Sequence, residues 1–168
     1  MTTDADPILL RYALSLGKLQ ANLMSLNVSL RAVLAKAKPR QDAVWAYDVA
    51  LLQVGDSIPE DAFSDWAHLK ELLDEYNSLP ETAEADAIDV KPVIDVRHAL
   101  AHGRVLKKNF EDPFTIIKFS KKPNNGKVVV TYKATMDDAW FRAQIGTVME
   151  AIHKVGRVTA RLGVRLPP

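Results

Sequence analysis

The feature that most constrains the fold is a long apolar pattern near the start of the chain, with residues spaced alternately three and four apart. Its members are Leu9, Tyr12, Leu16, Leu19, Leu23, Leu26, Leu30 and Val33. This a/d spacing is typical of a helix that packs against other helices. Asp6 is a good N-cap, Pro7 a good first helical residue, and Pro39 a terminator. We therefore predict one helix from about Pro7 to Lys36.

The same segment has apolar residues on a second side, namely Leu10, Leu14, Met24 and Val28. A helix that is apolar on more than one side is usually central in a bundle or covered by a second subunit. Both interpretations stay open at this stage.

Two further helices are expected before the middle of the chain. Residues 41–54 resemble a shorter buried helix that Gly55 closes. Ser57 to Glu60 is typical of a helix start, because a Ser cap is followed by Pro and then Glu. The helix it opens carries Phe63, Trp66, Leu69, Leu72, Leu73 and Tyr76 and stops before Pro80.

An acidic loop over residues 81–89 should precede the next helix. Asp89 can cap that helix, with Pro92 in its first turn, and it should run to about His102. Gly103 then stands where a left-handed residue commonly ends a helix.

The periodicity then changes from three or four to two. Residues 114–119 and 127–132 are rich in β-branched and aromatic side chains, and a turn-forming Pro-Asn-Asn-Gly lies between them. This predicts a β-hairpin over about residues 114–134, which must pack on helices because an isolated hairpin is only marginally stable.

The last helix is expected to begin at Thr135, which with Asp138 forms an approximate capping box. One face is apolar: Phe141, Ile145, Val148, Ile152, Val155, Thr159 and Leu162. The opposite face carries Lys154, Arg157, Arg161 and Arg165, which form either a solvated surface or a strip that attracts phosphates. The predicted fold class is mainly α, an up-and-down helical bundle with a β-hairpin inserted before the last long helix, in a single domain over residues 1–168.

Composition excludes several function classes. The chain has no Cys, which excludes a disulfide framework, a Cys-ligated metal site and thiol catalysis. Its longest strongly apolar stretch, residues 19–30, is too short to span a membrane. The acidic N-terminus does not resemble a signal peptide, so we expect a cytoplasmic protein.

The near-neutral net charge hides a strong asymmetry. Residues 1–96 hold 8 Lys and Arg against 16 Asp and Glu, whereas residues 97–168 hold 14 against 5. The basic half can present a face that attracts polyanions, or the two halves can pack together and neutralise each other.

One cluster, at the predicted end of the fourth helix, can carry chemistry: Arg97, His98, His102 and Arg104. His98 and His102 are four apart and share a helix face, as two metal ligands would, with Asp95 as a third. No fourth ligand is local, and Ala99 stands where a zinc protease has its Glu. A structural interpretation is that the His residues stabilise the negative end of the helix dipole, while Arg97 pairs with the acidic half.

The remaining interpretation is phosphodiester chemistry. Arg97 and His102 are five residues apart, which places them about 140° apart around a straight helix. They can converge only if the helix loosens at Gly103 or if a second copy, in a two-fold dimer, supplies its own pair.

The segment Arg97-His98-Ala99-Leu100-Ala101-His102-Gly103 resembles the Arg-x4–6-His signature of the HEPN superfamily, which favours a polar residue after the Arg. The order of elements agrees, with a long first helix, the motif at the end of a late helix, and a long last helix. The hairpin resembles a family-specific insertion.

The resemblance implies a metal-independent endoribonuclease without a cofactor, acting as a homodimer whose two motifs line one cleft. His102 would be the general base or acid on the ribose 2′-hydroxyl and the leaving group. Arg97 would bind the scissile phosphate, and His98 would orient or assist. Arg104, Lys107 and Lys108 directly follow the motif and would extend the RNA-binding surface.

The implied partners are RNA, a second copy, and an antitoxin or nucleotidyltransferase-type protein, as in toxin or defence systems. The alternative is a non-catalytic HEPN-like module that binds nucleotides or proteins. That alternative predicts that Arg97 and His102 are buried or hydrogen-bonded within one subunit.

Overall fold

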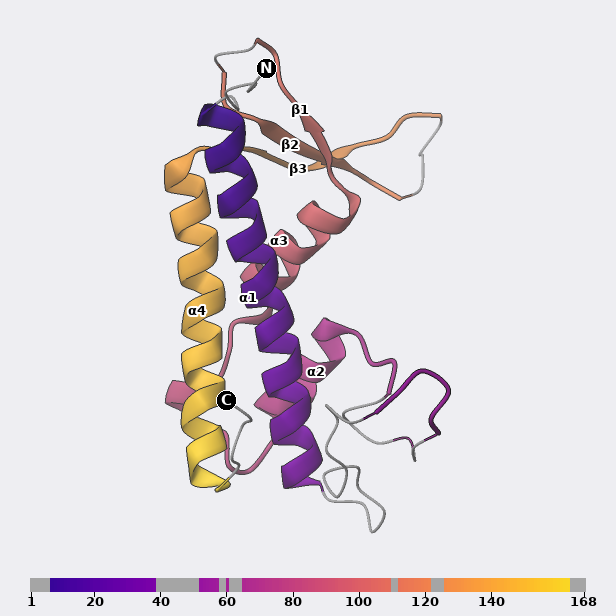
Figure 1. Ribbon diagram of the computed structural model, residues 1–168, viewed down its shortest axis with the longest axis vertical. Helices are drawn as coiled ribbons and strands as arrows, with labels where there is room; N and C mark the ends of the chain where they lie inside the picture. Colours follow the sequence, from indigo (N-terminus) through magenta and orange to yellow (C-terminus); the bar gives the residue numbers. More distant parts are fainter. Residues whose placement is uncertain are drawn as a thin grey trace. The chain divides into compact units, whose positions relative to one another are not determined.

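The computed structural model describes residues 7–38, 52–57, 60, 65–109, 112–121 and 126–163. In chain order its elements are α1 (Pro7–Ala37), α2 (Leu69–Asn77), the 3-10 helix η3 (Glu84–Asp86), α3 (Val90–His102), β1 (Arg104–Leu106), β2 (Thr115–Phe119), β3 (Val130–Thr135) and α4 (Asp138–Arg161) (Figure 1). The predicted mainly α fold, with an antiparallel hairpin before the last long helix, is confirmed. None of the described helices is both long and apolar enough to cross a bilayer.

The chain forms two compact units. Unit 1 consists of Met1–Leu23 and Lys91–Met149, and unit 2 of Met24–Val90 and Glu150–Pro168. The helices α1 and α4 are each divided between the two units: their residues up to Leu23 and Met149, respectively, belong to unit 1, and their remaining residues belong to unit 2. The expectation of a single domain stays a prediction.

The first helix follows its sequence pattern closely. α1 ends one residue beyond the predicted boundary, and the a/d residues from Leu19 onward are buried: Leu19, Leu23, Leu26, Leu30 and Val33. The second apolar side is exposed, at Leu10 and Leu14 in unit 1 and at Met24 and Val28 in unit 2. This side therefore finds no cover among the described residues.

In unit 2, the second helix of the structure, α2, begins later than the sequence predicts. α2 begins only at Leu69, where the Glu71 carboxylate accepts a hydrogen bond from the His68 backbone N–H. Trp66 precedes this helix and is 92% exposed, so its expected place on the helix is wrong. The start signal at residues 57–60 and the helix predicted for residues 41–54 lie largely outside the described residues.

Unit 1 holds an antiparallel sheet in the order β1-β2-β3. The strand β1 is a third strand that the sequence did not predict, and it pairs with β2 so that Arg104 lies opposite Ile117. β3 begins at Val130 rather than at residue 127 and ends at Thr135. Thr135 therefore does not cap α4; the Asp137 carboxylate does, by accepting a hydrogen bond from the Trp140 N–H.

The end of α3 brings the sheet close to the helix. α3 starts after Asp89 and reaches His102, as predicted, and then leads directly into β1 (Figure 1). Gly103 does not adopt the left-handed conformation that we expected of it. A Cβ atom at Gly103 would instead lie 2.3 Å from the Ala99 carbonyl oxygen of α3 and 2.7 Å from Cγ1 of Ile116 in β2, so there is no space for a side chain.

Candidate functional site

The residues of the Arg-x4-His motif lie in the second half of α3, in unit 1. One face of this helix is buried through Val93, Ile94, Val96 and Ala99. Arg97 and His98 lie beside that face and are partly buried, whereas His102, in the last turn, is exposed. The helix therefore anchors the motif by its apolar face and leaves His102 open to solvent.

The two imidazoles of the motif are neighbours. The ring centroids of His98 and His102 lie 5.9 Å apart, with 49° between the ring planes, as their four-residue spacing predicts. Burial lowers the pKa of His98 below its usual 6.5, and the positive charges of Lys118, Arg97, His102 and Lys121 lower it further. His98 is therefore neutral at pH 7, so one of its ring nitrogens can accept a proton.

Sequence reasoning missed two of these cations, Lys118 and Lys121. Both follow from the fold, because β2 pairs back onto β1, which begins directly after the motif helix. Period-two alternation does indicate a strand at Lys118, but it gives neither the register nor the neighbouring helix. A signal was present in the charge count, since residues 97–135 hold nine Lys and Arg against two Asp and Glu.

The predicted RNA-binding residues are placed differently from the motif. The Arg104 guanidinium lies over the Phe119 ring at 5.5 Å, and the Lys107 ammonium lies 5.3 Å from the centroid of the Phe114 ring. Lys108 is exposed. Because Arg104 is paired with Ile117, it lies on the face of the sheet opposite to Lys118. Lys118 and Lys121, rather than Arg104, therefore contribute to the positive potential that lowers the pKa of His98.

No match is found when the chain is compared with protein-family models, curated proteins and solved structures. The geometry of the motif therefore has to be interpreted from its own chemistry.

Arg97 and His102 do not converge within one chain by a loosened helix. α3 is helical through His102, and the Gly103 N–H still donates to the Ala99 carbonyl oxygen at 2.7 Å. Because the helix keeps its pitch up to this point, the two side chains remain on different sides of it. Arg97 can therefore approach a His102 side chain only if a second copy of the helix supplies one of the two.

The metal and ion-pair interpretations of the motif receive little support. Asp95 pairs with Lys91 on α3, and in the described part of the chain no three His, Asp or Glu side chains cluster as metal ligands. The expected pairing of Arg97 with the acidic half does not occur with any described residue, since no hydrogen bond or ion pair involves its side chain.

The basic face of α4 does pair with the acidic loop, within unit 2. Arg157 and Arg161 bind the two carboxylate oxygens of buried Asp86 at 2.6 and 2.5 Å. Lys154 donates to the Ala87 carbonyl oxygen. These three residues are therefore neither a merely solvated surface nor a strip open to phosphates, and Arg165 lies outside the described residues.

Proposed function

We propose that this protein is a HEPN-like, metal-independent endoribonuclease that acts as a homodimer. The observation that carries the proposal is the pair of neighbouring imidazoles at the end of α3, one of which, His98, feels the positive charges of Lys118, Arg97 and Lys121. Cations attract the RNA backbone, and a pair of imidazoles can both remove and deliver a proton.

In the proposed reaction, the ribose 2′-oxygen attacks the adjacent phosphorus and the bond to the 5′-oxygen breaks. One imidazole accepts the proton of the 2′-hydroxyl, and another donates a proton to the leaving 5′-oxygen. The exposed His102 takes one of these roles, and the neutral His98 is suited to accepting the proton. A guanidinium stabilises the charge that builds on the phosphate oxygens.

The guanidinium comes from Arg97 of the second copy, because α3 keeps Arg97 and His102 of one chain on different sides. The exposed apolar side of α1, at Leu10 and Leu14 in unit 1, supports pairing of two copies. The non-catalytic alternative predicts that the motif side chains are buried or hydrogen-bonded within the subunit. The exposure of His102, and a guanidinium of Arg97 that pairs with no residue in the described part of the chain, favour the catalytic proposal over it.

The first test measures cleavage of mixed-sequence RNA in the presence of a metal chelator. We expect cleavage by the natural protein, and loss of at least about 10²-fold in rate for His102→Ala with an unchanged melting temperature. His153→Ala is the matched control, because His153 is an exposed imidazole on α4, in unit 2. Intact RNA with the natural protein, or equal rates for the two variants, would overturn the proposal.

A second arm tests whether the site is shared between copies. Arg97→Ala and His102→Ala are each expected to be inactive alone. When the two variants are mixed and allowed to exchange subunits, half of the dimers are mixed, and each mixed dimer has one intact site. The mixture should therefore recover about a quarter of the natural activity. No recovery after verified exchange contradicts a shared site.

A further inference from the structure

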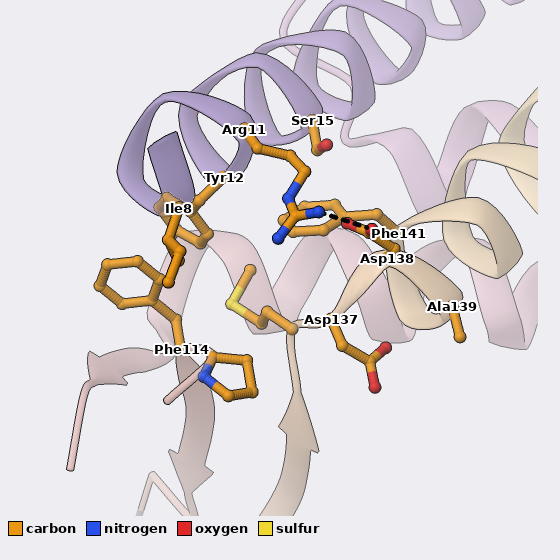
Figure 2. Close-up of a pocket in the computed structure, with 11 residues that line it drawn as sticks. Ile8, Arg11, Tyr12, Ser15, Phe114, Asp137, Asp138, Ala139 and Phe141 are labelled. Atoms are coloured by element: carbon orange, nitrogen blue, oxygen red, sulfur yellow. Dashed lines mark hydrogen bonds and ion pairs between the residues drawn. The ribbon is translucent and has the colours of Figure 1, made fainter. Parts of the chain in front are cut away.

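A pocket of about 390 Å³ lies in unit 1, separate from the motif (Figure 2). It opens between the first turns of α1, the segment before β2, and the junction of β3 with α4. Its lining combines aromatic and apolar side chains with a charged mouth: Ile8, Arg11, Tyr12, Ser15, Pro113, Phe114, Met136, Asp137, Asp138, Ala139 and Phe141. Pockets of this size hold small organic molecules in other proteins.

One wall of the pocket is aromatic. The Tyr12 ring lies 4.1 Å from Phe114, with 34° between the planes, and 5.9 Å from Phe141 in an edge-on arrangement. Burial raises the pKa of Tyr12, so its phenol stays neutral and adds no negative charge. Phe141 and Met136 are buried and close the pocket from within. A flat, uncharged ring system is the ligand type that stacks on such a wall.

The mouth carries one guanidinium beside one carboxylate. Nη1 of Arg11 lies 3.2 Å from Oδ2 of Asp138, and Figure 2 shows the two groups side by side, joined by a dashed line. The side chains are 62% and 57% exposed, and such a solvent-screened ion pair contributes little stability. Both groups can therefore turn toward a ligand at low cost. One oxygen of Asp137 already caps α4, which leaves Asp138 as the acceptor.

We propose that this pocket binds a guanine base. Guanine carries two adjacent N–H donors, at N1 and N2, which a carboxylate accepts together, and beside them the O6 and N7 acceptors that a guanidinium recognises. Adenine presents an acceptor at N1, which repels a carboxylate. Cytosine presents one donor group and uracil one donor between two carbonyl oxygens, so neither matches both charges of the mouth.

The guanine can belong to an RNA chain or to a free nucleotide. Lys107, whose ammonium lies 5.3 Å from the centroid of the Phe114 ring, supplies a cation for a phosphate attached to the base. Binding of guanine within RNA rests on the proposed ribonuclease function, whereas binding of the free nucleotide does not. The two sources are separated in the experiment below.

The test titrates the full-length protein with GMP, AMP, CMP and UMP and follows binding by calorimetry. GMP is expected to bind at least about tenfold more tightly than the other three, the discrimination that one bidentate pair provides. Asp138→Asn and Arg11→Gln should each remove this preference. Lys18→Gln, an exposed cation on α1 outside the pocket, should leave it unchanged.

Asp138 lies in the first turn of α4, so the fold of each variant is first checked by its melting temperature. Tyr12→Leu is the additional variant, because it removes stacking but no charge and should weaken GMP binding. Equal binding of all four nucleotides, or no binding at millimolar concentrations, would overturn the guanine assignment.

The last arm compares GMP with the short oligoribonucleotides GUUU and AUUU. Tighter binding of GUUU than of GMP identifies RNA as the source, and equal binding identifies the free nucleotide. The measurements are repeated with His102→Ala, which should bind guanine normally. If this variant cleaves RNA as the natural protein does while GMP binding is specific, the ribonuclease proposal fails and the guanine site stands.

Discussion

A glycine at position 103 can be explained either by a left-handed backbone conformation or by a lack of space for a side chain, and the structure distinguishes the two. A glycine directly after a helix commonly adopts a left-handed conformation, but Gly103 does not. A Cβ atom there would lie 2.3 Å from the Ala99 carbonyl oxygen and 2.7 Å from Cγ1 of Ile116 in β2, so only glycine fits. At this position there is therefore no room for a side chain between the end of α3 and β2.

Substitution of Gly103 by Ala should be destabilising. The added methyl would overlap the Ala99 carbonyl oxygen and the Ile116 side chain, and overpacking of this kind costs about 1–3 kcal/mol or more. Gly146→Ala is the matched control, because a Cβ atom there meets nothing within 4 Å. It lies inside α4, so the same change should raise the free energy of unfolding by up to about 1 kcal/mol. Urea unfolding of both variants checks the prediction, and equal changes of the same sign would contradict it.

Within unit 2, the carboxylate of Asp86 links the 3-10 helix η3 to the second half of α4 through two ion pairs. Asp86 is buried and accepts hydrogen bonds from two guanidinium groups, while the Tyr76 hydroxyl donates to its backbone carbonyl oxygen. Burial, with the charge of Asp86 as a second cause, raises the pKa of Tyr76 to about 12, so this phenol stays protonated. The acidic loop is thus a structural partner of α4.

These ion pairs of Asp86 should make the stability of the folded protein sensitive to acid. Hydrogen bonds from Arg161 and Arg157 lower the pKa of Asp86 below its ordinary 3.8. A carboxyl group with a lowered pKa in the folded state contributes its full stability above the ordinary pKa. That contribution is lost as the pH falls from about 3.8 through the lowered value.

Melting temperatures measured from pH 7 to pH 2 check this. Asp86→Asn should melt below the natural protein at pH 7, and the difference should shrink below about pH 4. Glu84→Gln is the control, because Glu84 is an exposed carboxylate on the same short helix. A constant difference between Asp86→Asn and the natural protein across the whole range contradicts the assigned role.

At the scale of the whole molecule, the exposed apolar side of α1 is the surface through which we propose that two copies pair. In unit 1, Leu10 is 52% and Leu14 66% exposed, on the side of the helix away from its buried a/d residues. Exposed apolar residues that recur on one helix face are typical of a surface that a partner covers. Pairing through this face agrees with a site that takes Arg97 from one copy and His102 from the other.

Leu14→Lys should therefore separate the copies without unfolding either. We expect sedimentation velocity to show a dimer for the natural protein and a monomer for the variant, because a buried, unpaired ammonium opposes association. The melting temperature of the separated protomer should stay close to its natural value, since Leu14 is mostly exposed within the protomer. Ala143→Lys adds the same charge at an exposed site on α4 and should remain dimeric. A natural protein that is monomeric at every concentration contradicts the shared site.

The sequence by itself determined α1, α3 and the position of His98 beside His102. These follow from helix periodicity and caps, because each helical hydrogen bond joins residues only four apart. It also determined that a hairpin precedes α4. The tertiary structure alone decided β1, the place of Lys118 and Lys121 near His98, the reason for Gly103, the pairing of Asp86 with Arg157 and Arg161, and the pocket beside Tyr12. Each of these depends on contacts between residues far apart in the chain, which local periodicity does not specify.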